Sequence, residues 1–236
     1  MNAEPKIHIS ILKEAVMPVL VVVCSVVHLL NDGILNIAAL AMFMTYEYAN
    51  FRLFIIENLI IFFLNVIQYY QSLLVELITP REAVLVKLCN IQDRLADVNS
   101  RIQKVYGFPL LCMVLSDFCF INVNMFFVVK RIKDPGVLIV ISWVTIVFLM
   151  IFRIAIVCER MKEKGEEFYS VLYRVVKKEK TCKLLNNSYL RAHLLKKKTF
   201  SFNLAGFVEV DMNLVAGVIS ATATYTIILI QMGKDF

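Results

Sequence analysis

Four ionisable residues lie inside long apolar runs of the sequence: Asp32, Glu57, Asp117 and Arg153. A charge inside a hydrocarbon layer is unfavourable, so such residues usually face protein or water and often have a function. Asp117 falls near the middle of its run, and Arg153 falls closer to the end of the next one. We expect these two to pair if their helices are adjacent. The pair would be structural, or Arg153 would reach the interface; the alternative is a role in ion handling.

Polar side chains also recur in the last apolar run of the chain. Thr224, Ile228 and Gln231 fall on one stripe of a helix, with Tyr225 beside them. Such a face is unfavourable against lipid and should meet protein or water. It would line a pore in a symmetric oligomer, or it would hydrogen-bond helices within one subunit. The sequence favours neither alternative.

No motif of a catalytic or metal site is present. The histidines His8, His28 and His193 are scattered, and the cysteines form no C-x-x-C pair. The spacings of metalloproteases, hydrolases and nucleotide-binding loops are missing. We therefore expect no enzyme activity, no cofactor and no metal. The formal net charge is +6, but the basic residues lie between apolar runs, which is typical of membrane topology and not of nucleic-acid binding.

The composition indicates a membrane protein. The chain is 59% hydrophobic, with only 7 Gly and 5 Pro among its 236 residues, whereas soluble domains are about 45–50% apolar. Apolar runs of about 18 residues or more predict α-helical spans. The predicted fold is an all-α membrane protein: a multi-pass helical bundle of about five transmembrane helices with a cytoplasmic helical anchor region. The spans are expected at 15–44, 53–78, 108–129, 137–157 and 212–231.

The first run is ambiguous because Asn31-Asp32-Gly33 interrupts it. It is one long tilted pass or two short passes, which gives five or six spans in total. The single pass is favoured because it leaves the N-terminus, with Lys6 and Lys13, in the cytoplasm. Short external links are then expected at 46–52 and at the turn 133–136.

Charge counting sets the expected orientation. Between Glu159 and Asp211 there are twelve Lys and Arg against seven Asp and Glu, so this segment should be cytoplasmic. The predicted organisation is a cytoplasmic N-terminus at 1–14, transmembrane helices over 15–158 with a cytoplasmic helical extension at 79–106, a basic cytoplasmic loop at 159–211, a last, pore-type helix at 212–232 and an extracellular tail at 233–236.

The extension carries a helical pattern of its own. Apolar residues alternate by four and three over 84–105, which predicts one apolar helix face. An apolar face of the basic loop, with Phe168, Leu172 and Val175, would cover it and form a cytoplasmic bundle. The alternative is a single amphipathic helix on the membrane surface. The residues of the stripe are Val84, Leu88, Ile91, Leu95, Val98, Ile102 and Val105.

The C-terminal part of the sequence resembles insect gustatory receptors. Thr224-Tyr225, five mostly apolar residues and Gln231 are similar to the terminal Thr-Tyr, five residues, Gln-Phe signature of that family. Two further stretches resemble the approaches to its seventh and fifth helices. The first contains Phe202, Ala205-Gly206-Phe207 and Asp211; the second contains Val98-Asn99, Tyr106-Gly107 and Leu110-Leu111. The resemblance covers residues 50–236.

The resemblance implies a seven-helix receptor in the plasma membrane, with its N-terminus inside and its C-terminus outside. Receptors of this family are tetrameric ligand-gated cation channels, with a pore lined by the last helix and a pocket for a small-molecule tastant in the outer half. Pore and gate residues would be Thr224, Tyr225, Ile228, Gln231 and Met232. The ligand-binding residues and the tastant stay unassigned.

Two departures from the family are expected to matter. Met232 replaces the final Phe of the signature, and five spans would correspond to the third to seventh helices of the family. The first hypothesis is therefore a gustatory receptor subunit acting as a ligand-gated cation channel in a homo- or hetero-tetramer. The second is a truncated non-conducting subunit, or a membrane scaffold, that assembles with full-length receptors. A small transporter using Asp117 and Arg153 is a weaker alternative, because no internal repeat is seen.

Overall fold

The computed structural model describes residues 37–130, 137–179 and 183–232, which are almost entirely helical. Three helices dominate, and at 1.5 Å per residue each is about 60–75 Å long. A hydrocarbon core is only about 30 Å thick, so each of these helices must extend well beyond it. They are α2 (Ile37–Glu76, 40 residues), α3 (Glu82–Lys130, 49 residues) and α4 (Val137–Lys178, 42 residues).

The remaining elements follow α4 in the chain. Two short helices, α5 (Lys183–Asn186) and α6 (Ser188–Leu195), precede a small antiparallel hairpin of β1 (Asn203–Leu204) and β2 (Val208–Glu209). The last helix is α7 (Met212–Met232).

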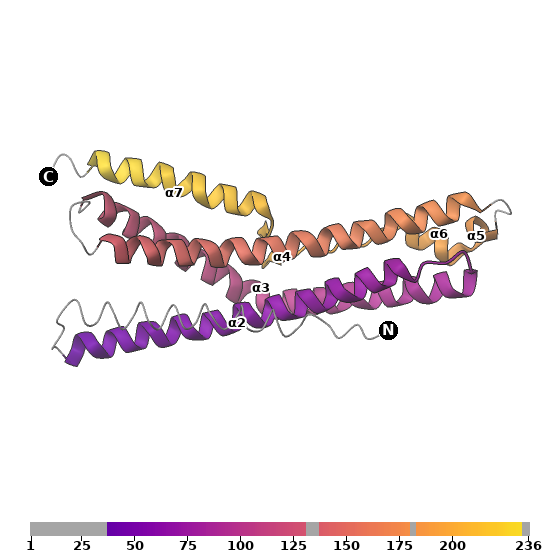
Figure 1. Cartoon of the computed structure of the whole chain (residues 1–236), viewed down its shortest axis with the longest axis horizontal. Helices are drawn as coiled ribbons and strands as arrows, with labels where there is room; N and C mark the ends of the chain where they lie inside the picture. Colours follow the sequence, from indigo (N-terminus) through magenta and orange to yellow (C-terminus); the bar gives the residue numbers. More distant parts are fainter. Residues whose placement is uncertain (1–36, 131–136, 180–182, 233–236) are drawn as a thin grey trace.

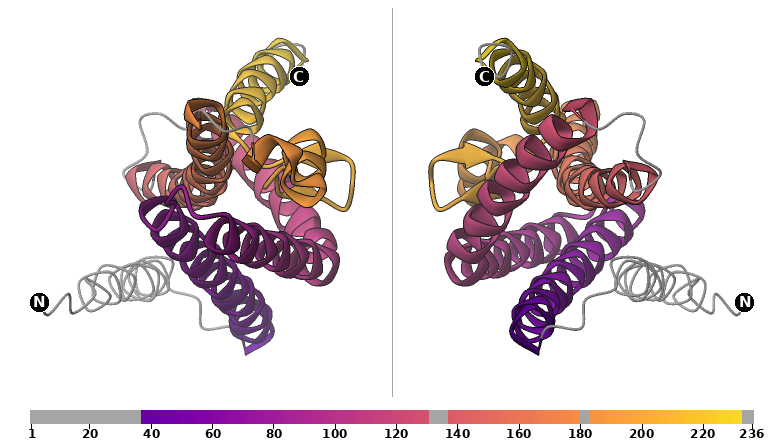
Figure 2. Two further views of the ribbon diagram at one scale, coloured as in Figure 1. Left: turned by 90° about the vertical axis from the view of Figure 1, so that its right-hand side faces the viewer. Right: turned by 90° about the vertical axis from the view of Figure 1, so that its left-hand side faces the viewer.

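The long helices run in alternating directions and form a bundle with two unlike halves (Figure 1). In one half, α7 packs beside α3 and α4. In the other half, α5 and α6 take its place against the same long helices. The end-on views show α7 on the opposite side of the bundle from α2 (Figure 2). One side of α7 is therefore left without a helix of the described residues to cover it.

Four of the described helices are long and apolar enough to cross a membrane, at Phe54–Glu76, Glu82–Lys130, Val140–Lys178 and Met212–Gln231. The chain is therefore an all-α, multi-pass membrane protein, as its composition predicts. Most of the predicted first span at 15–44, and with it the choice between five and six spans, lies outside the described residues. The predicted turn at 133–136 lies outside them as well.

One predicted boundary is wrong. A link was expected at 46–52, after a first span ending at Met44, but residues 37–76 form the single helix α2. The physical reason is local: the segment Tyr46–Arg52 contains neither glycine nor proline, so nothing in it ends a helix. Its charged residues, Glu47 and Arg52, do not interrupt backbone hydrogen bonding.

The interior is divided into two apolar clusters, one in each half. The proximal cluster joins α2, α3, α4 and α7 around the hairpin strand β1. The distal cluster joins the far ends of α2, α3 and α4 to α5 and α6, and includes Leu85 and Leu88 of α3 with Phe168 and Leu172 of α4. The predicted packing of the 84–105 helix against the apolar face of residues 168–175 is thus confirmed.

The predicted apolar stripe on α3 is only half correct. Leu88 and Ile102 are buried, but Ile91, Val98 and Val105 are 44%, 45% and 63% exposed. The buried face is rotated by about one residue and includes two polar side chains, Gln92 and Asn99. The reason is that α3 binds the backbone before and within β1: the Asn99 amide donates to Ser201 O at 3.2 Å, and Gln103 donates to Asn203 O at 3.3 Å.

Close packing of β1 onto α3 depends on Gly107. A Cβ at this position would lie 3.1 Å from both Ala205 N and Asn203 O, which is shorter than an ordinary van der Waals contact. Two residues later, Pro109 lies inside α3. Proline removes one helical hydrogen bond and bends helices, and α3 turns away from α2 in its second half (Figure 1).

Candidate functional site

The C-terminal helix α7 has two chemically different faces. Val215, Val218, Thr222 and Thr226 are buried against the bundle. The predicted stripe lies on the other side: Thr224, Ile228 and Gln231 are all exposed in the isolated chain, as is Tyr225. The structure thus brings the predicted residues together on one open surface. Met232 ends the helix, and its side chain is outside the described part.

Hydrogen bonds to other helices of the described residues do not account for this stripe. Thr224 Oγ1 donates to Ser220 O of the same helix at 2.9 Å. Among the described residues, no hydrogen bond joins Thr224 or Gln231 to another helix. A polar stripe of this kind, if it faced lipid, would leave the Gln231 amide without partners. The surface therefore requires a neighbouring protein surface or water.

Tyr225 lies at the edge of this stripe and fixes α7 to α3. Its ring meets the edge of Phe118, with centroids 5.9 Å apart and planes inclined by 75°, a favourable aromatic geometry. The side chain is nevertheless 52% exposed. It belongs both to the packed face of α7 and to the open stripe.

Carboxylates hold the start of α7 in place. Asp211 precedes the helix, and its Oδ1 accepts the N–H of Leu214 at 3.0 Å, which is N-terminal capping. Glu159 of α4 accepts the N–H of Met212 at 3.1 Å. Desolvation alone would raise the pKa of Asp211, but its hydrogen bonds with Leu214 and Asn213 outweigh this and lower the pKa below the ordinary value.

A second contact ties this region to α4. Lys162 Nζ lies 2.9 Å from Glu209 Oε1 of β2. Both side chains are about one-third exposed, so the pair itself adds little stability. The pair matters because of its position. Lys162 connects α4 to Glu209, and Glu159 connects α4 to Met212, so α4 contacts both ends of the short segment that leads into α7.

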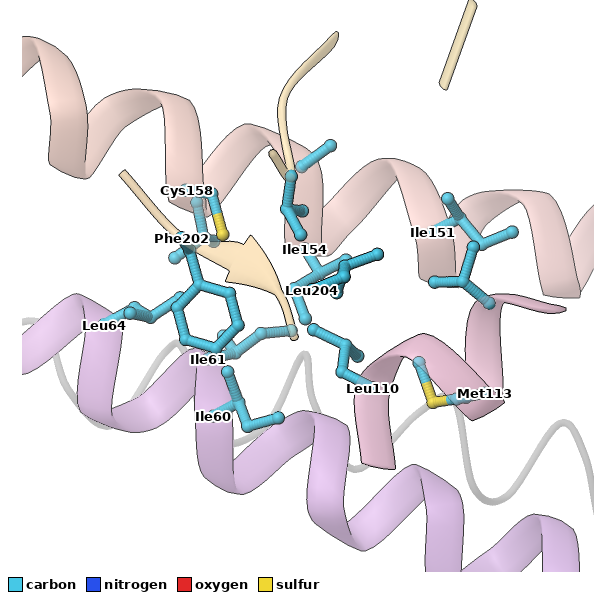
Figure 3. Packing of buried hydrophobic residues seen from close by; sticks show 14 of the residues in the cluster. Ile60, Ile61, Leu64, Leu110, Met113, Ile151, Ile154, Cys158, Phe202 and Leu204 are labelled. Carbon is cyan, nitrogen blue, oxygen red and sulfur yellow. The ribbon is translucent and has the colours of Figure 1, made fainter. Parts of the chain in front are cut away.

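The segment that leads into the hairpin, together with β1, is inserted into the middle of the bundle, whereas Phe207 in the turn is 79% exposed. Phe200, Phe202 and Leu204 are each 1% exposed. Figure 3 shows Phe202 and Leu204 pointing between α2 and α4, among residues of all three long helices. The segment before α7 therefore packs against all three long helices, α2, α3 and α4.

The expected pair of Asp117 and Arg153 is not formed. Arg153 instead donates from Nη2 to Asn58 Oδ1, and its Nε lies 4.0 Å from Glu57 Oε1, both on α2. Glu57 is 0% exposed. The sequence showed Glu57 as an intramembrane charge, but nothing in it indicated that α4 packs on α2 at this level. Asp117 Oδ2 is buried without a hydrogen-bond partner in the described part of the chain.

Among the described residues, the surface is hollowed at two places. The larger, of about 1030 Å³, lies between α4, α5 and α6 in the distal half. The smaller, of about 520 Å³, lies beside the base of α7, where Phe118 meets the hairpin and the first turns of that helix. The smaller one has Glu209 and Asp211 on an otherwise mostly apolar wall.

Sequence reasoning did not find the supports of α7. Asp211 directly before an apolar helix is a recognisable capping signal and could have been identified. Glu159 and Lys162 could not, because their role depends on where the hairpin returns to α4. The contact of Glu57 with Arg153 could not be predicted either, because it depends on how α4 packs on α2.

Comparison with known proteins agrees with this architecture. No curated protein matches the chain significantly. The family profile described as 7tm Chemosensory receptor matches residues 11–235, which is nearly the whole sequence. The match includes the four spanning helices, of which the C-terminal helix with its polar stripe is the last. On this basis, the chain belongs to the 7tm chemosensory receptor family.

Proposed function

We propose that the chain is a subunit of a gustatory receptor that acts as a ligand-gated cation channel in the plasma membrane. The observation that carries the proposal is the exposed polar stripe of Thr224, Ile228 and Gln231 on α7. In a tetramer with four-fold symmetry, four such stripes would face a central axis. Water in the pore would then hydrate the Gln231 amide and the Thr224 hydroxyl.

The surface of α3 supports assembly with further subunits. Ile91, Val98 and Val105 recur at seven-residue intervals and are 44–63% exposed. They lie on the half of α3 that precedes the apolar run at 108–129, in the part that we propose to be outside the hydrocarbon layer. An apolar row of this spacing suits packing against another helix. We propose that it contributes to the contact between subunits.

The connection between the long helices and α7 suggests how a ligand would act. A small molecule bound among the membrane-spanning helices would shift the receptor only if it bound the open state more tightly. The inserted hairpin, with Glu159 and Lys162, would pass a movement of α4 to the base of α7. The chemical class of the tastant stays open.

The charges support one orientation. The basic segment 159–211 contains α5, α6 and the end of α4, and the positive-inside rule places such segments in the cytoplasm. The N-terminus would then be cytoplasmic, and α7 would end at the extracellular face.

The proposal is tested by whole-cell recording with surface labelling, using panels of sugars, bitter compounds and amines. A ligand-evoked cation current that changes in Gln231→Ala, but not in Ile219→Ala at another exposed position of α7, would support the pore assignment. Unaltered currents in Gln231→Ala and Thr224→Ala would refute it. Surface expression without current, alone and with other receptor subunits present, would favour the non-conducting subunit.

Cysteine accessibility provides a sharper control. Thr224→Cys and Thr222→Cys differ by two positions on one helix, but Thr222 is only 5% exposed. A charged thiol reagent requires a thiolate in water. It should block current in Thr224→Cys and leave Thr222→Cys and the parent chain unchanged. Lack of modification at Thr224→Cys would place the stripe against lipid or protein.

A further inference from the structure

His193 of α6 lies where three helices meet. Its side chain is buried, and its Nδ1 lies 3.4 Å from Asp93 Oδ2 of α3. The imidazole stacks on Tyr169 of α4, with centroids 5.3 Å apart and planes 24° apart. It also stacks on Tyr189 of its own helix at 6.3 Å and 18°. One ring thus joins α6 to both α3 and α4.

The groups around this ring form one connected network. Lys198 Nζ lies 3.3 Å from Asp93 Oδ1 and 3.1 Å from Asp97 Oδ1, and its backbone N–H donates to the Tyr169 hydroxyl. The Tyr189 hydroxyl donates to Asp93 Oδ2. The groups that face or adjoin the imidazole and can carry charge are Asp93, Asp97 and the buried Cys89 from α3, Tyr169 from α4, Tyr189 from α6 and Lys198 from the following segment.

The geometry favours the neutral ring. Nδ1 is placed to donate its hydrogen to Asp93, so Nε2 carries the lone pair in the neutral tautomer. Nε2 is buried and has no hydrogen-bond partner in the described residues. A second proton would go to Nε2 and create a buried charged donor without an acceptor, which is unfavourable. Asp93 cannot compensate fully because it also binds Lys198.

We propose that His193 is an acid-sensitive latch: the neutral imidazole holds α6 against α3 and α4, and protonation at Nε2 weakens that docking.

The direction of the pH effect follows from burial. Desolvation lowers the pKa of His193 below its ordinary value of 6.5; Asp93 opposes this shift, and Lys198 adds to it. Because the docked state binds the proton more weakly than the undocked state, docking is fully stabilised above about pH 6.5 and is weakened as the pH falls below it. Acidification, not alkalinity, therefore releases α6.

Release of α6 would reach α7 through the segment between them. Lys198 is two residues from Phe200, which is buried in the proximal cluster, and the same segment continues through β1 to the base of α7. Acid on the side that faces α6 would then alter gating. This consequence rests on the channel function proposed above, whereas the latch itself does not.

The latch is tested by hydrogen–deuterium exchange on the full chain in detergent at about pH 7.5 and about pH 5.5, with rates corrected for intrinsic exchange. Exchange of the amides of 188–198 should rise several-fold on acidification. The rise should be absent in His193→Gln, which keeps a donor for Asp93, and in His193→Phe, which keeps the ring stack. A His8→Gln/His28→Gln double variant, which removes the other two histidines, should behave like the parent chain.

Two results would overturn the latch. One is an equal acid-induced rise in both His193 variants; the other is no rise in the parent chain. An NMR titration of the parent chain, which needs no variant, decides the matter if either substitution prevents folding. A pH midpoint below 6.5 for the titration of the His193 ring signals supports the latch. A pH midpoint at or above 6.5 contradicts it. Both readouts are independent of current, so failure of the channel proposal would leave them unaffected.

Discussion

Arg153 of α4 reaches across to α2, where its Nε lies 4.0 Å from the fully buried carboxylate of Glu57. The Glu57 oxygens have no hydrogen-bond partner in the part of the chain that the structure describes, and Arg153 lies at the limit of ion-pair distance from them while it donates a hydrogen bond to Asn58. Removing one member of a buried pair leaves the other uncompensated, which is far costlier than removing both. The pair therefore specifies how α4 packs on α2.

Arg153→Met is expected to destabilise the protein by roughly 1–3 kcal/mol, measured as a loss of thermal stability in detergent, because Asn58 and Glu57 lose their partner on α4. Glu57→Gln combined with Arg153→Met should recover part of the loss, because the buried carboxyl group that Arg153 leaves behind is then replaced by an amide. A double-mutant cycle of Arg153→Met with Asp117→Asn should show a smaller interaction energy than the cycle with Glu57→Gln. An interaction energy with Asp117 as large as that with Glu57 would contradict the pairing described above.

The tight contact between α4 and the hairpin segment gives a second prediction. A Cβ on Gly165 would lie 2.7 Å from Cδ2 of the buried Phe200 ring. Gly165→Ala should therefore force Phe200 to move and destabilise the protein by roughly 1–3 kcal/mol. Gly217→Ala is the matched control on α7, because a Cβ there meets nothing within 4 Å. Equal melting temperatures for the two variants would show that Phe200 adapts freely.

The sequence predicts which face of a helix a residue lies on where that placement depends on the helix alone. The stripe of Thr224, Ile228 and Gln231 follows from helical periodicity, and so does the presence of a long helix through 84–105. The errors arose where another segment decides the outcome. The buried face of α3 is rotated because β1 binds Asn99 and Gln103, and Arg153 pairs with Glu57 because α4 packs along α2.

The exposed apolar row on α3 gives a third prediction. Val98→Glu would place a charge in the proposed contact between subunits, whereas Ser100→Glu adds the same charge at another exposed position of the helix. Crosslinking in native membranes should show loss of higher oligomers for Val98→Glu and not for Ser100→Glu. Thermal stability of the subunit should be unchanged in both, because neither side chain is buried. Intact oligomers in Val98→Glu would remove this surface from the contact.

The cap of α7 gives the last prediction. Asp211 Oδ1 accepts the N–H of Leu214, and Oδ2 accepts the Asn213 amide. Replacing a capping Asp by Ala typically costs about 1 kcal/mol, whereas Asn caps almost equally well. Asp211→Ala should therefore speed amide exchange in the first turn of α7, at residues 212–215, while Asp211→Asn should leave it near the parent rate.

Because Glu159 of α4 also binds the first N–H of α7, the loss in Asp211→Ala should stay confined to that turn. Adding Glu159→Gln should extend faster exchange further along the helix, since both carboxylates at its start are then removed. If the channel function holds, the double variant should also change gating more than either single variant, because the base of the pore helix is no longer fixed to α4. Unchanged exchange in the double variant would mean that packing against α3, including the contact of Tyr225 with Phe118, holds the helix without help from its cap.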